Sequence, residues 1–545
     1  MADVRDEVQV LLKRHQELVT ERGPREALWR ECERWVDPEQ QGGFFRRQPG
    51  GQRDGHITEN TAQMGLEAFV AAMDAMLMPE GEQVTLLKTS DAALNDVPAV
   101  ARWLQHASDR LHACRNAAHT GFQSASALRW RMLGIYGWAG MWIDEWVGRG
   151  LFYQTPHPSE LYIDDDFRGR IDTVHRRREV KARQLAQMFH NDQLPPKVKQ
   201  ALADNKPDQC FTLVHIIRPN SAHEPGRLDS RRFPIQSIYL LEETRDLISV
   251  GGYYSHPLPV SRYILSPHDA YGVGPSGKVI GTIRQLNIMA KDTIKAFHLA
   301  LQPPILMPSD GSINRMNMTP GAPIPGGMDN GKEQIKPFNS GANPIYSDKA
   351  IEKAVNTVNT AFLVHVFAIM QEPIDRQTAT EYLGRKREAM LLQAPNAGRQ
   401  IGEALVPSAE RELDILMRAR QIDPMPPEMR EAGAGLLIEC DNPLTRAAKS
   451  ADAHNFMGAL EMLTPMAQID PSIYDVIDTD AAPRGLMRAM GVRADWLRDP
   501  DQVAALRQAK AEQQQGASLV EAAPAATQAM LNMAKARQLS MGGGA

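Results

Sequence analysis

The stretch "YGVGPSGKVIGTIRQLNIMAKDTIKAFHLALQPPILMP", residues 271–308, decides the fold. Behind its glycines, apolar side chains recur every three or four positions, which predicts an amphipathic helix over residues 278–301. A helix of that length makes about seven turns. Its apolar stripe consists of Val279, Ile283, Leu286, Ala290, Ile294, Phe297 and Leu301.

The same pattern returns further along the chain and predicts a second helix over residues 347–370, with Ser347 and Asp348 as its cap. Its stripe consists of Ile351, Val355, Val358, Phe362, Val366 and Ile369. The residues between the two helices are rich in Pro and Gly. A connection of that length in a folded domain usually has a function of its own. The sequence therefore predicts two matched helices joined by an insertion.

The glycines that precede the first helix have the spacing of a nucleotide-binding P-loop, G-x-x-x-x-G-K, from Gly272 to Lys278. Val279 stands where the Ser or Thr that holds magnesium should follow, and Pro275 removes one backbone N–H donor from any phosphate cradle. We interpret the segment as a glycine turn that opens the helix, with Lys278 in its first turn.

The region before these glycines predicts helices followed by a sheet. Residues 1–130 show helical spacing, interrupted at Gly23-Pro24 and by a polar, Gly-rich loop at 37–55. From about 131 to 265, apolar and polar residues alternate between Gly, Pro and Asp, which predicts an antiparallel, loop-rich sheet. One helix, "KARQLAQMFHND" (181–192), is expected among these strands.

The region after the second helix is again mostly helical. A third long helical stretch is predicted over 378–421, after a break at Glu372-Pro373. "AGLLIEC" (434–440) predicts a strand that leads into a further helix, and the last hundred residues are helical and increasingly Ala/Gln-rich. The expected fold class is mainly α with an α+β part.

Composition narrows the function classes. The net charge of −5 argues against a dedicated nucleic-acid clamp, which usually carries a basic excess. Four separated cysteines without a C-x-x-C pair argue against a zinc site and fit a reducing compartment. The longest apolar run, residues 361–370, is far short of a membrane span, so we expect a soluble protein that folds inside a cell.

No motif predicts an active site, and neither a cofactor nor a metal is expected. The chain contains no H-E-x-x-H and no G-x-S-x-G sequence. The acidic run "IDDDF" (163–167) lacks the spacing of a calcium loop and is typical of a solvated turn between strands.

The two matched helices also carry a polar pattern. Helical spacing gathers Arg284, Lys291, Lys295 and His298 on one strip of the first helix, and Lys349, Lys353, Asn356 and Thr360 on one strip of the second. Two interpretations stay open: a solvated helix face, or a surface along which a polyanion passes with few contacts.

In the order of its segments, the chain resembles the portal, or head-to-tail connector, proteins of short-tailed bacteriophages (podoviruses). Four stretches within residues 20–460 carry the resemblance: "ITENTAQMGLEAFVAAMDAMLMPEGEQVTLL" (57–87), the stretch quoted first, "QEPIDRQTATEYLGRKREAMLLQAPNAGRQIGEALVPSAERELDILMRA" (371–419) and "LLIECDNPLTRAAKSADAH" (436–454). The resemblance implies a non-enzymatic portal fold in a ring oligomer, usually of twelve subunits, with a DNA tunnel on its axis.

The resemblance also implies a division of the chain. The expected parts are an N-terminal wing part (1–277), stem helix 1 (278–302), a clip (303–346), stem helix 2 (347–370), a tunnel-loop region (371–378), a C-terminal wing part with a long helix (379–445), and a crown with the C-terminal tail (446–545). The candidate DNA-tunnel residues are Arg284, Lys291, Lys295, Lys349, Lys353 and, near the constriction, Arg376.

The implied partners are other copies of the chain, double-stranded DNA, the large terminase, a tail adaptor, and capsid and scaffold proteins, with no membrane. The implied location is the portal vertex of the virion, after assembly in the host cytoplasm. Two alternatives stay open. One is a nucleotide-dependent DNA-packaging enzyme that uses the degenerate P-loop at 272–278, and the other is an internal scaffold or ejection protein.

Overall fold

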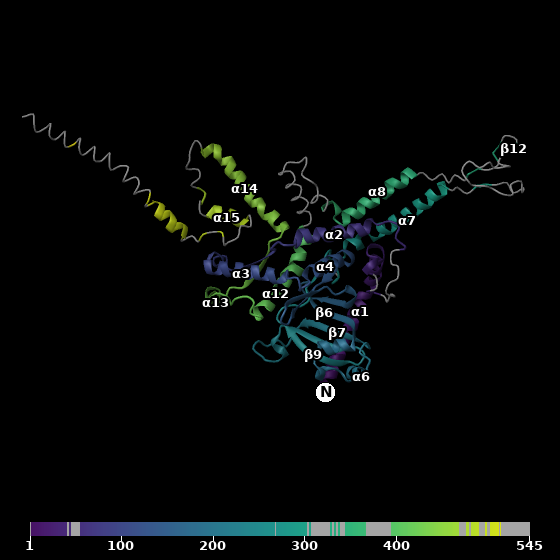
Figure 1. Cartoon of the computed structure of the whole chain (residues 1–545), viewed down its shortest axis with the longest axis horizontal. Coiled ribbons are helices and arrows are strands. Elements are labelled where there is room, and N and C mark those ends of the chain that lie inside the picture. The colour runs from purple at the N-terminus through teal and green to yellow at the C-terminus, as the bar shows by residue number, and fades with distance from the viewer. Residues whose placement is uncertain are drawn as a thin grey trace, which may run out of the picture. The chain divides into compact units, whose positions relative to one another are not determined.

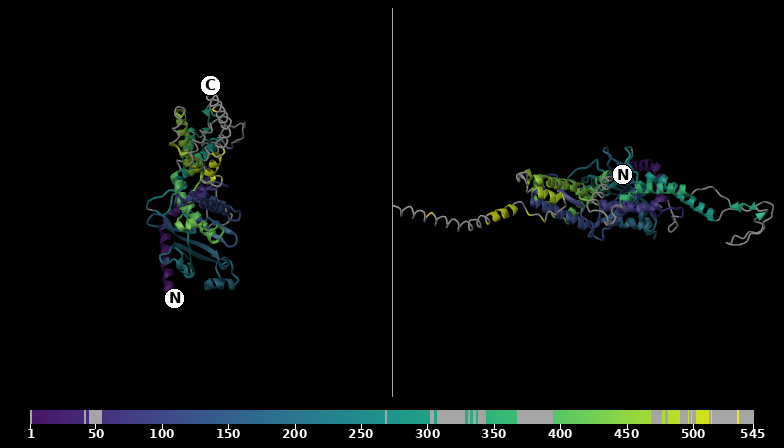
Figure 2. Two further views of the ribbon diagram at one scale, coloured as in Figure 1. Left: turned by 90° about the vertical axis from the view of Figure 1, so that its left-hand side faces the viewer. Right: turned by 90° about the horizontal axis from the view of Figure 1, so that it is seen from above.

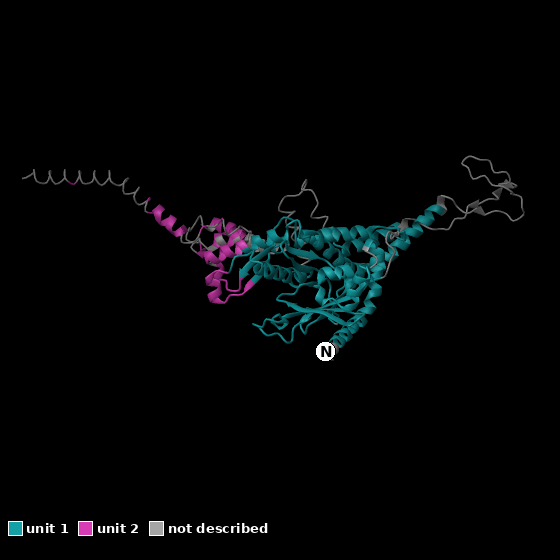
Figure 3. Ribbon diagram, turned by 60° about the horizontal axis from the view of Figure 1, so that its bottom comes forward, with its two compact units in different colours: residues 1–88, 107–424, 437–448 teal, residues 89–106, 425–436, 449–545 magenta. Residues whose placement is uncertain are grey.

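The structure is a computed structural model of the whole chain. It describes residues 2–40, 43–44, 55–267, 269–301, 305–306, 328–329, 332–333, 336–337, 344–366, 394–467, 476–478, 481–489, 496, 498, 502–511, 513 and 533. The chain divides into two compact units (Figure 3). Unit 1 comprises residues 1–88, 107–424 and 437–448, and unit 2 comprises residues 89–106, 425–436 and 449–545.

Helix α1 (Ala2–Val36) is continuous, so the expected interruption at Gly23-Pro24 is wrong. Both residues are exposed to solvent, where water can hydrate the carbonyl that the proline leaves without a partner. On the opposite side the helix is anchored: the Arg22 guanidinium donates to the backbone oxygens of Ser159 and Leu161 at 3.0 and 2.8 Å. These tertiary contacts hold the helix together across the proline.

The helices and short strands that follow α1 differ in part from the expectation. Helix α2 (Thr61–Leu77) ends just before Pro79, and α3 (Pro98–Arg115) follows it, both within the helical region predicted for residues 1–130. Helix α4 (Phe122–Tyr136) extends past residue 131, where the sequence predicts the change from helices to strands. Strand β1 (Thr85–Thr89) was not predicted, and it pairs with the predicted strand β15 (Leu436–Cys440).

A five-stranded sheet with the order β5-β6-β7-β8-β9 confirms the antiparallel prediction (Figure 1). Its strands are β5 (Leu161–Asp165), β6 (Ile171–Lys181), β7 (Cys210–Pro219), β8 (Ile235–Leu241) and β9 (Asp246–Tyr253). Two short pairs accompany it: β2 (Trp138–Gly140) with β10 (Val260–Arg262), and β3 (Trp142–Trp146) with β4 (Gly150–Gln154).

Side chains alternate between the two faces of the sheet, and each face packs into its own hydrophobic core. Leu213 faces helices α5 (Ala182–Met188) and α6 (Pro196–Ala203), where it packs with Leu185 and Val198. The next residue, Val214, faces α1 and packs with Leu11. Helix α6 was not predicted, because only the α5 segment showed a clear helical pattern.

Helices α7 (Pro275–Leu301) and α8 (Pro344–Ala361) lie side by side (Figures 1 and 2). Each begins three residues before its predicted start. The predicted end of α8 at 370 is wrong as far as the structure describes it, since Leu363 has a left-handed backbone with φ of 61°. Phe362, fully buried, fixes this break: its ring lies so close to Gly65 that a Cβ there would be 3.1 Å away.

The other elements are short or lie in the C-terminal part. They are η1 (Pro38–Gln40), η2 (Leu94–Asp96), η3 (Pro158–Glu160), η4 (Asn191–Gln193), η5 (Ser230–Arg232), β11 (Ile305–Leu306), β12 (Met328–Asp329), β13 (Lys332–Glu333), β14 (Lys336–Pro337), α11 (Ala394–Gln400), the π-helix η6 (Ile401–Leu405), α12 (Val406–Arg418), α13 (Pro427–Ala432), α14 (Pro443–Ala467) and α15 (Ala481–Ala489). Helices α11 to α12 confirm the C-terminal half of the third helical stretch; residues 367–393 lie outside the described residues.

A pair of buried histidines joins α1 to the sheet. The rings of His15 and His175 stack with their centroids 5.5 Å apart, and each residue is only 2% exposed. Tyr162 meets His15 edge-on at 4.8 Å. Burial lowers the pKa of His15 to about 4, and burial and the neighbouring His15 lower the pKa of His175 to about 3. Both rings are therefore neutral in the folded protein near pH 7.

This pair predicts a loss of stability in acid. The unfolded chain binds a proton at His15 below about pH 6.5, whereas the folded chain binds it only near pH 4. Between these values each pH unit lowers the free energy of unfolding by about 1.4 kcal/mol for this histidine. We expect His15→Phe to remove that part of the acid dependence in urea titrations from pH 7 to pH 4. The exposed His223→Phe serves as the control, and equal acid slopes for His15→Phe and the wild type would contradict the prediction.

Candidate functional site

A groove runs along one face of α8. The predicted polar strip of Lys349, Lys353, Asn356 and Thr360 lines it, because these residues recur at spacings of four and three on the helix. The groove has a volume of about 730 Å³. The remaining lining residues are Tyr263, Ile264, Pro275, Lys278, Val279, Glu352, Thr357, Ala361, Leu363 and Asn396.

The groove carries a net positive charge. Lys278, Lys349 and Lys353 are exposed and face a single carboxylate, that of Glu352. Among the described residues, no ion pair involves any of these four side chains. Burial raises the pKa of Tyr263 to about 12, so its hydroxyl stays neutral and adds no negative charge. Such an arrangement can neutralise phosphate groups of a passing polyanion.

The two threonines of the groove contribute less than their hydroxyls suggest. Thr357 donates its hydroxyl to the Lys353 carbonyl at 2.9 Å, and Thr360 donates to the Asn356 carbonyl at 2.7 Å. Their protons are therefore occupied by the helix backbone. The lysine ammonium groups and the side-chain amides remain as donors for a ligand.

The candidate residues of α7 lie elsewhere. Arg284 pairs with Glu31 of α1 at 3.1 Å, and Lys295 pairs with Asp292 on its own helix at 3.6 Å. Lys291 is exposed, and none of the three lines the groove. Arg376 lies outside the described residues. Whether any of these four meets DNA stays a prediction.

Sequence reasoning did not include Lys278 among the candidate site residues, although the structure brings it into the groove. The available signal was its place in the first turn of α7 beside the matched second helix. That signal does not say which face of α8 the lysine meets, since this depends on how the two helices pack.

The glycines before α7 pack against the end of α4 and form no open phosphate cradle. A Cβ at Gly272 would lie 2.3 Å from the carbonyl oxygen of Gly137, and one at Gly274 would lie 2.8 Å from that of Gly134. Gly137, at φ of 84°, meets Gly274 equally closely from the other side. Backbone carbonyl oxygens packed against these glycines leave no room for a phosphate and would repel its charge, so the structure favours a tightly packed turn over a nucleotide site.

The apolar stripe of α7 is covered by its own chain only over the first half. Val279, Ile283 and Leu286 are buried. Farther along the helix, Ile294 is 46% exposed and Phe297 is 56% exposed. The distal half of α7 thus presents an apolar face that another molecule can cover.

Within the described ranges, no cluster of three or more His, Cys, Asp or Glu side chains could hold a metal ion. No described helix is long and apolar enough to cross a bilayer. The acidic run at 163–167 is only partly the predicted turn, because its first three residues belong to strand β5. The turn begins at Asp166, whose carboxylate accepts the backbone N–H groups of Arg168 and Arg170 at 2.8 and 2.9 Å.

Comparison with known proteins adds the last observations. The family model described as "Bacteriophage head to tail connecting protein" matches residues 8–497. The chain is 25% identical to the probable portal protein of Bordetella phage BPP-1, over 94% of this chain and 92% of that protein. It is 24% identical to the portal protein of Salmonella phage epsilon15, over 95% of this chain and 94% of that protein.

Among solved structures, a chain from the virion of a native gene transfer agent particle aligns with 76% of this chain and 91% of its own length, at 10% identity. The TM-score of this alignment is 0.36, which is too low to establish a shared fold.

Proposed function

Because the chain belongs to the family of bacteriophage head to tail connecting proteins, we propose that it is a portal protein. It forms a ring-shaped channel at one vertex of the capsid, through which double-stranded DNA is packaged and later ejected. Two relatives named portal proteins support this proposal, since each aligns with nearly its whole length. The protein acts as a conduit and docking platform and not as an enzyme.

The half-covered hairpin of α7 and α8 is the observation that carries the proposal. A monomer exposes Ile294 and Phe297 of α7 to water. Such an apolar surface favours association with another molecule. A ring covers that face, because each hairpin packs against the next around a closed cycle. An internal scaffold or ejection protein has no comparable need for two matched helices that flank an insertion.

We assign the parts of the chain to the places that the family resemblance implies. Helices α7 and α8 form the stem, the insertion at 303–346 forms the clip, and the five-stranded sheet with its helices belongs to the wing. The chain from 446 onward forms the crown and tail. By this assignment the clip meets the large terminase during packaging and the tail adaptor afterwards, while capsid and scaffold proteins surround the ring in the virion.

The groove along α8 is the part that meets DNA in this proposal. Its lysines supply a few phosphate contacts per subunit, and twelve or so subunits repeat them around the axis. The net charge of −5 keeps the whole chain from holding DNA tightly. Weak, repeated contacts suit a tunnel in which the duplex must slide.

Lys349→Glu combined with Lys353→Glu tests this function. We expect rings to form normally in electron micrographs, with a central hole wide enough for a duplex. The amount of DNA packaged and retained should fall on the order of tenfold, because reversed charges repel the phosphates. Packaged DNA per particle is measured by nuclease protection.

Lys197→Glu with Lys199→Glu is the matched control, since both lysines are exposed on α6 and the charge change is the same. It should package like the wild type. Loss of rings in the Lys349/Lys353 variant alone would place these lysines at subunit contacts instead. A wild-type protein that stays monomeric under every condition would overturn the portal function itself.

A further inference from the structure

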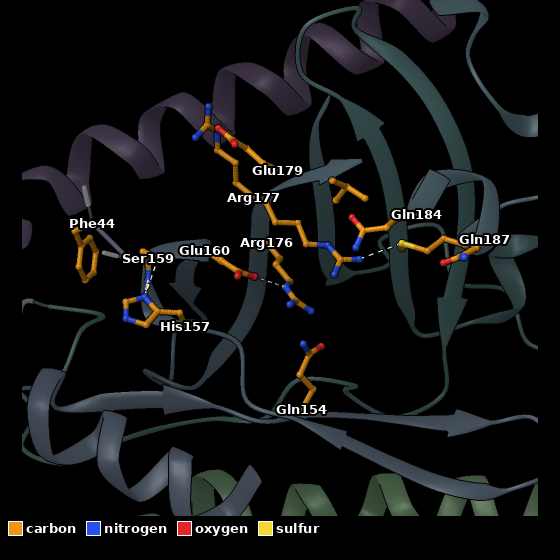
Figure 4. A pocket seen from close by; sticks show the side chains of 14 residues that line it. Phe44, Gln154, His157, Ser159, Glu160, Arg176, Arg177, Glu179, Gln184 and Gln187 are labelled. Carbon is orange, nitrogen blue, oxygen red and sulfur yellow. Dashed lines mark hydrogen bonds and ion pairs between the residues drawn. The ribbon is translucent and has the colours of Figure 1, made fainter. Parts of the chain in front are cut away.

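A second hollow in the described part of unit 1 lies beside the sheet and has no role in the proposed conduit. It has a volume of about 880 Å³ and is here called the arginine pocket. Figure 4 shows Arg176 and Arg177 between η3 on one side and Gln184 and Gln187 of α5 on the other. The complete lining is Gly43, Phe44, Gln154, His157, Ser159, Glu160, Arg176, Arg177, Arg178, Glu179, Val180, Gln184, Gln187 and Met188.

The three successive arginines of β6 differ in how they are compensated. Arg176 donates to the Glu160 carboxylate at 2.9 Å, and Arg177 donates to the Glu242 carboxylate at 2.7 Å. Arg178 donates only to the thioether sulfur of Met188, at 3.2 Å. A thioether is a weak acceptor, and no described carboxylate lies within ion-pair distance of Arg178. One guanidinium in the pocket therefore lacks a counter-ion.

The position of Arg178 makes that missing counter-ion costly. Its side chain is partly buried, and burial together with the neighbouring Arg176 lowers the pKa of Arg178. The charged form is thus destabilised in the free protein. An anion that enters the pocket removes this penalty and gains charge-assisted hydrogen bonds from the planar guanidinium.

The rest of the lining limits the kind of anion. Glu160 and Glu179 also face the pocket and disfavour a polyphosphate, whereas the single arginine there without a described ion pair, Arg178, matches one carboxylate. Gln154, Gln184 and Gln187 offer amide donors and acceptors, the groups that pair with a peptide backbone. Met188 and Phe44 offer apolar atoms for the stem of an acidic side chain. This combination is that of a peptide site.

We propose that the arginine pocket binds a glutamate or aspartate side chain on an extended segment of a partner protein, with Arg178 as the carboxylate's main contact. The proposal concerns a surface outside the α7–α8 hairpin, so it stands or falls separately from the passage of DNA.

The test selects ligands from a library of random nine-residue peptides against immobilised full-length protein. We expect an acidic residue to be enriched at one position on the order of tenfold over the library. A selected peptide, labelled with fluorescein, should lose on the order of tenfold in affinity when that residue becomes Gln or when the protein carries Arg178→Gln. Arg178→Lys should bind the peptide more weakly than the wild type does, because lysine keeps the positive charge but lacks the planar guanidinium that donates two parallel hydrogen bonds to a carboxylate.

Arg183→Gln is the matched control, because Arg183 is an exposed arginine on the adjoining helix α5 and does not line the pocket. It should bind the selected peptide like the wild type. Thermal unfolding of Arg178→Gln should be no easier than that of the wild type, since the replaced cation loses no ion pair and only a weak hydrogen bond to the Met188 sulfur. Peptides without an acidic residue, unchanged binding by Arg178→Gln, or displacement of the peptide by a short DNA duplex would each overturn the proposal.

Discussion

Replacing Ile294 and Phe297 with aspartate is expected to yield a folded chain that no longer assembles into rings. Both side chains lie on the half of α7 that the protein's own chain leaves uncovered. Covering the exposed half of each with a neighbouring subunit contributes roughly half of the 1.5–3 kcal/mol that full burial of such a side chain gives. The substitutions remove that contribution and place charges in the interface, where they cost further free energy.

Sedimentation velocity and electron microscopy measure the assembly, and thermal unfolding of the monomer measures the fold. The fold should persist because Val279, Ile283 and Leu286, which anchor α7, are unchanged. Phe167→Asp with Leu228→Asp is the control, since these residues are 90% and 94% exposed in loops of the same unit. Intact rings in the Ile294/Phe297 variant would show that the distal face of α7 is not a subunit contact.

The sequence predicted the features that depend on local spacing. The stripes of α7 and α8 follow from a repeat of three and four residues, and the same repeat placed Lys349, Lys353, Asn356 and Thr360 on one strip. The antiparallel sheet followed from alternation, which sends Leu213 and Val214 to opposite faces. Each of these patterns depends only on residues a few positions apart in the chain.

The features that were missed depend on residues far apart in the chain. Strand β1 forms because β15 supplies its hydrogen-bonding partner, and α1 continues past Pro24 because Arg22 is anchored to η3 and β5. The lack of a counter-ion at Arg178 also depends on residues far apart in the chain. The run "RRR" at 176–178 is visible in the sequence, but only the fold decides which arginine meets Glu160 and which meets Glu242.

Another long-range contact, the ion pair of Arg115 and Glu412, predicts the largest single effect on stability. The pair joins the end of α3 to α12, with side chains 4% and 0% exposed. The Arg115 Nε–H donates to Glu412 at 2.9 Å, and a second guanidinium nitrogen donates to the Thr85 hydroxyl of β1 at 2.9 Å. Three elements distant in sequence thus meet at one guanidinium.

Glu412→Leu should lower the free energy of unfolding by about 3–5 kcal/mol, because it leaves the Arg115 cation buried without its carboxylate. That is a large part of the 5–15 kcal/mol that typically stabilises a folded protein. The measurement is urea unfolding in the monomeric Ile294→Asp, Phe297→Asp background, so that ring contacts do not contribute.

Adding Arg115→Met to Glu412→Leu should recover most of the loss, since two apolar side chains of similar size need no counter-ion. Asp208→Asn is the control, because its partner Lys181 is exposed and such surface pairs contribute about 0–1 kcal/mol. If the double variant were no more stable than Glu412→Leu alone, the loss would come from packing at α12 and not from the stranded cation. Recovery would instead show that α3, α12 and β1 are held by hydrophobic burial, with the ion pair fixing how these three elements meet.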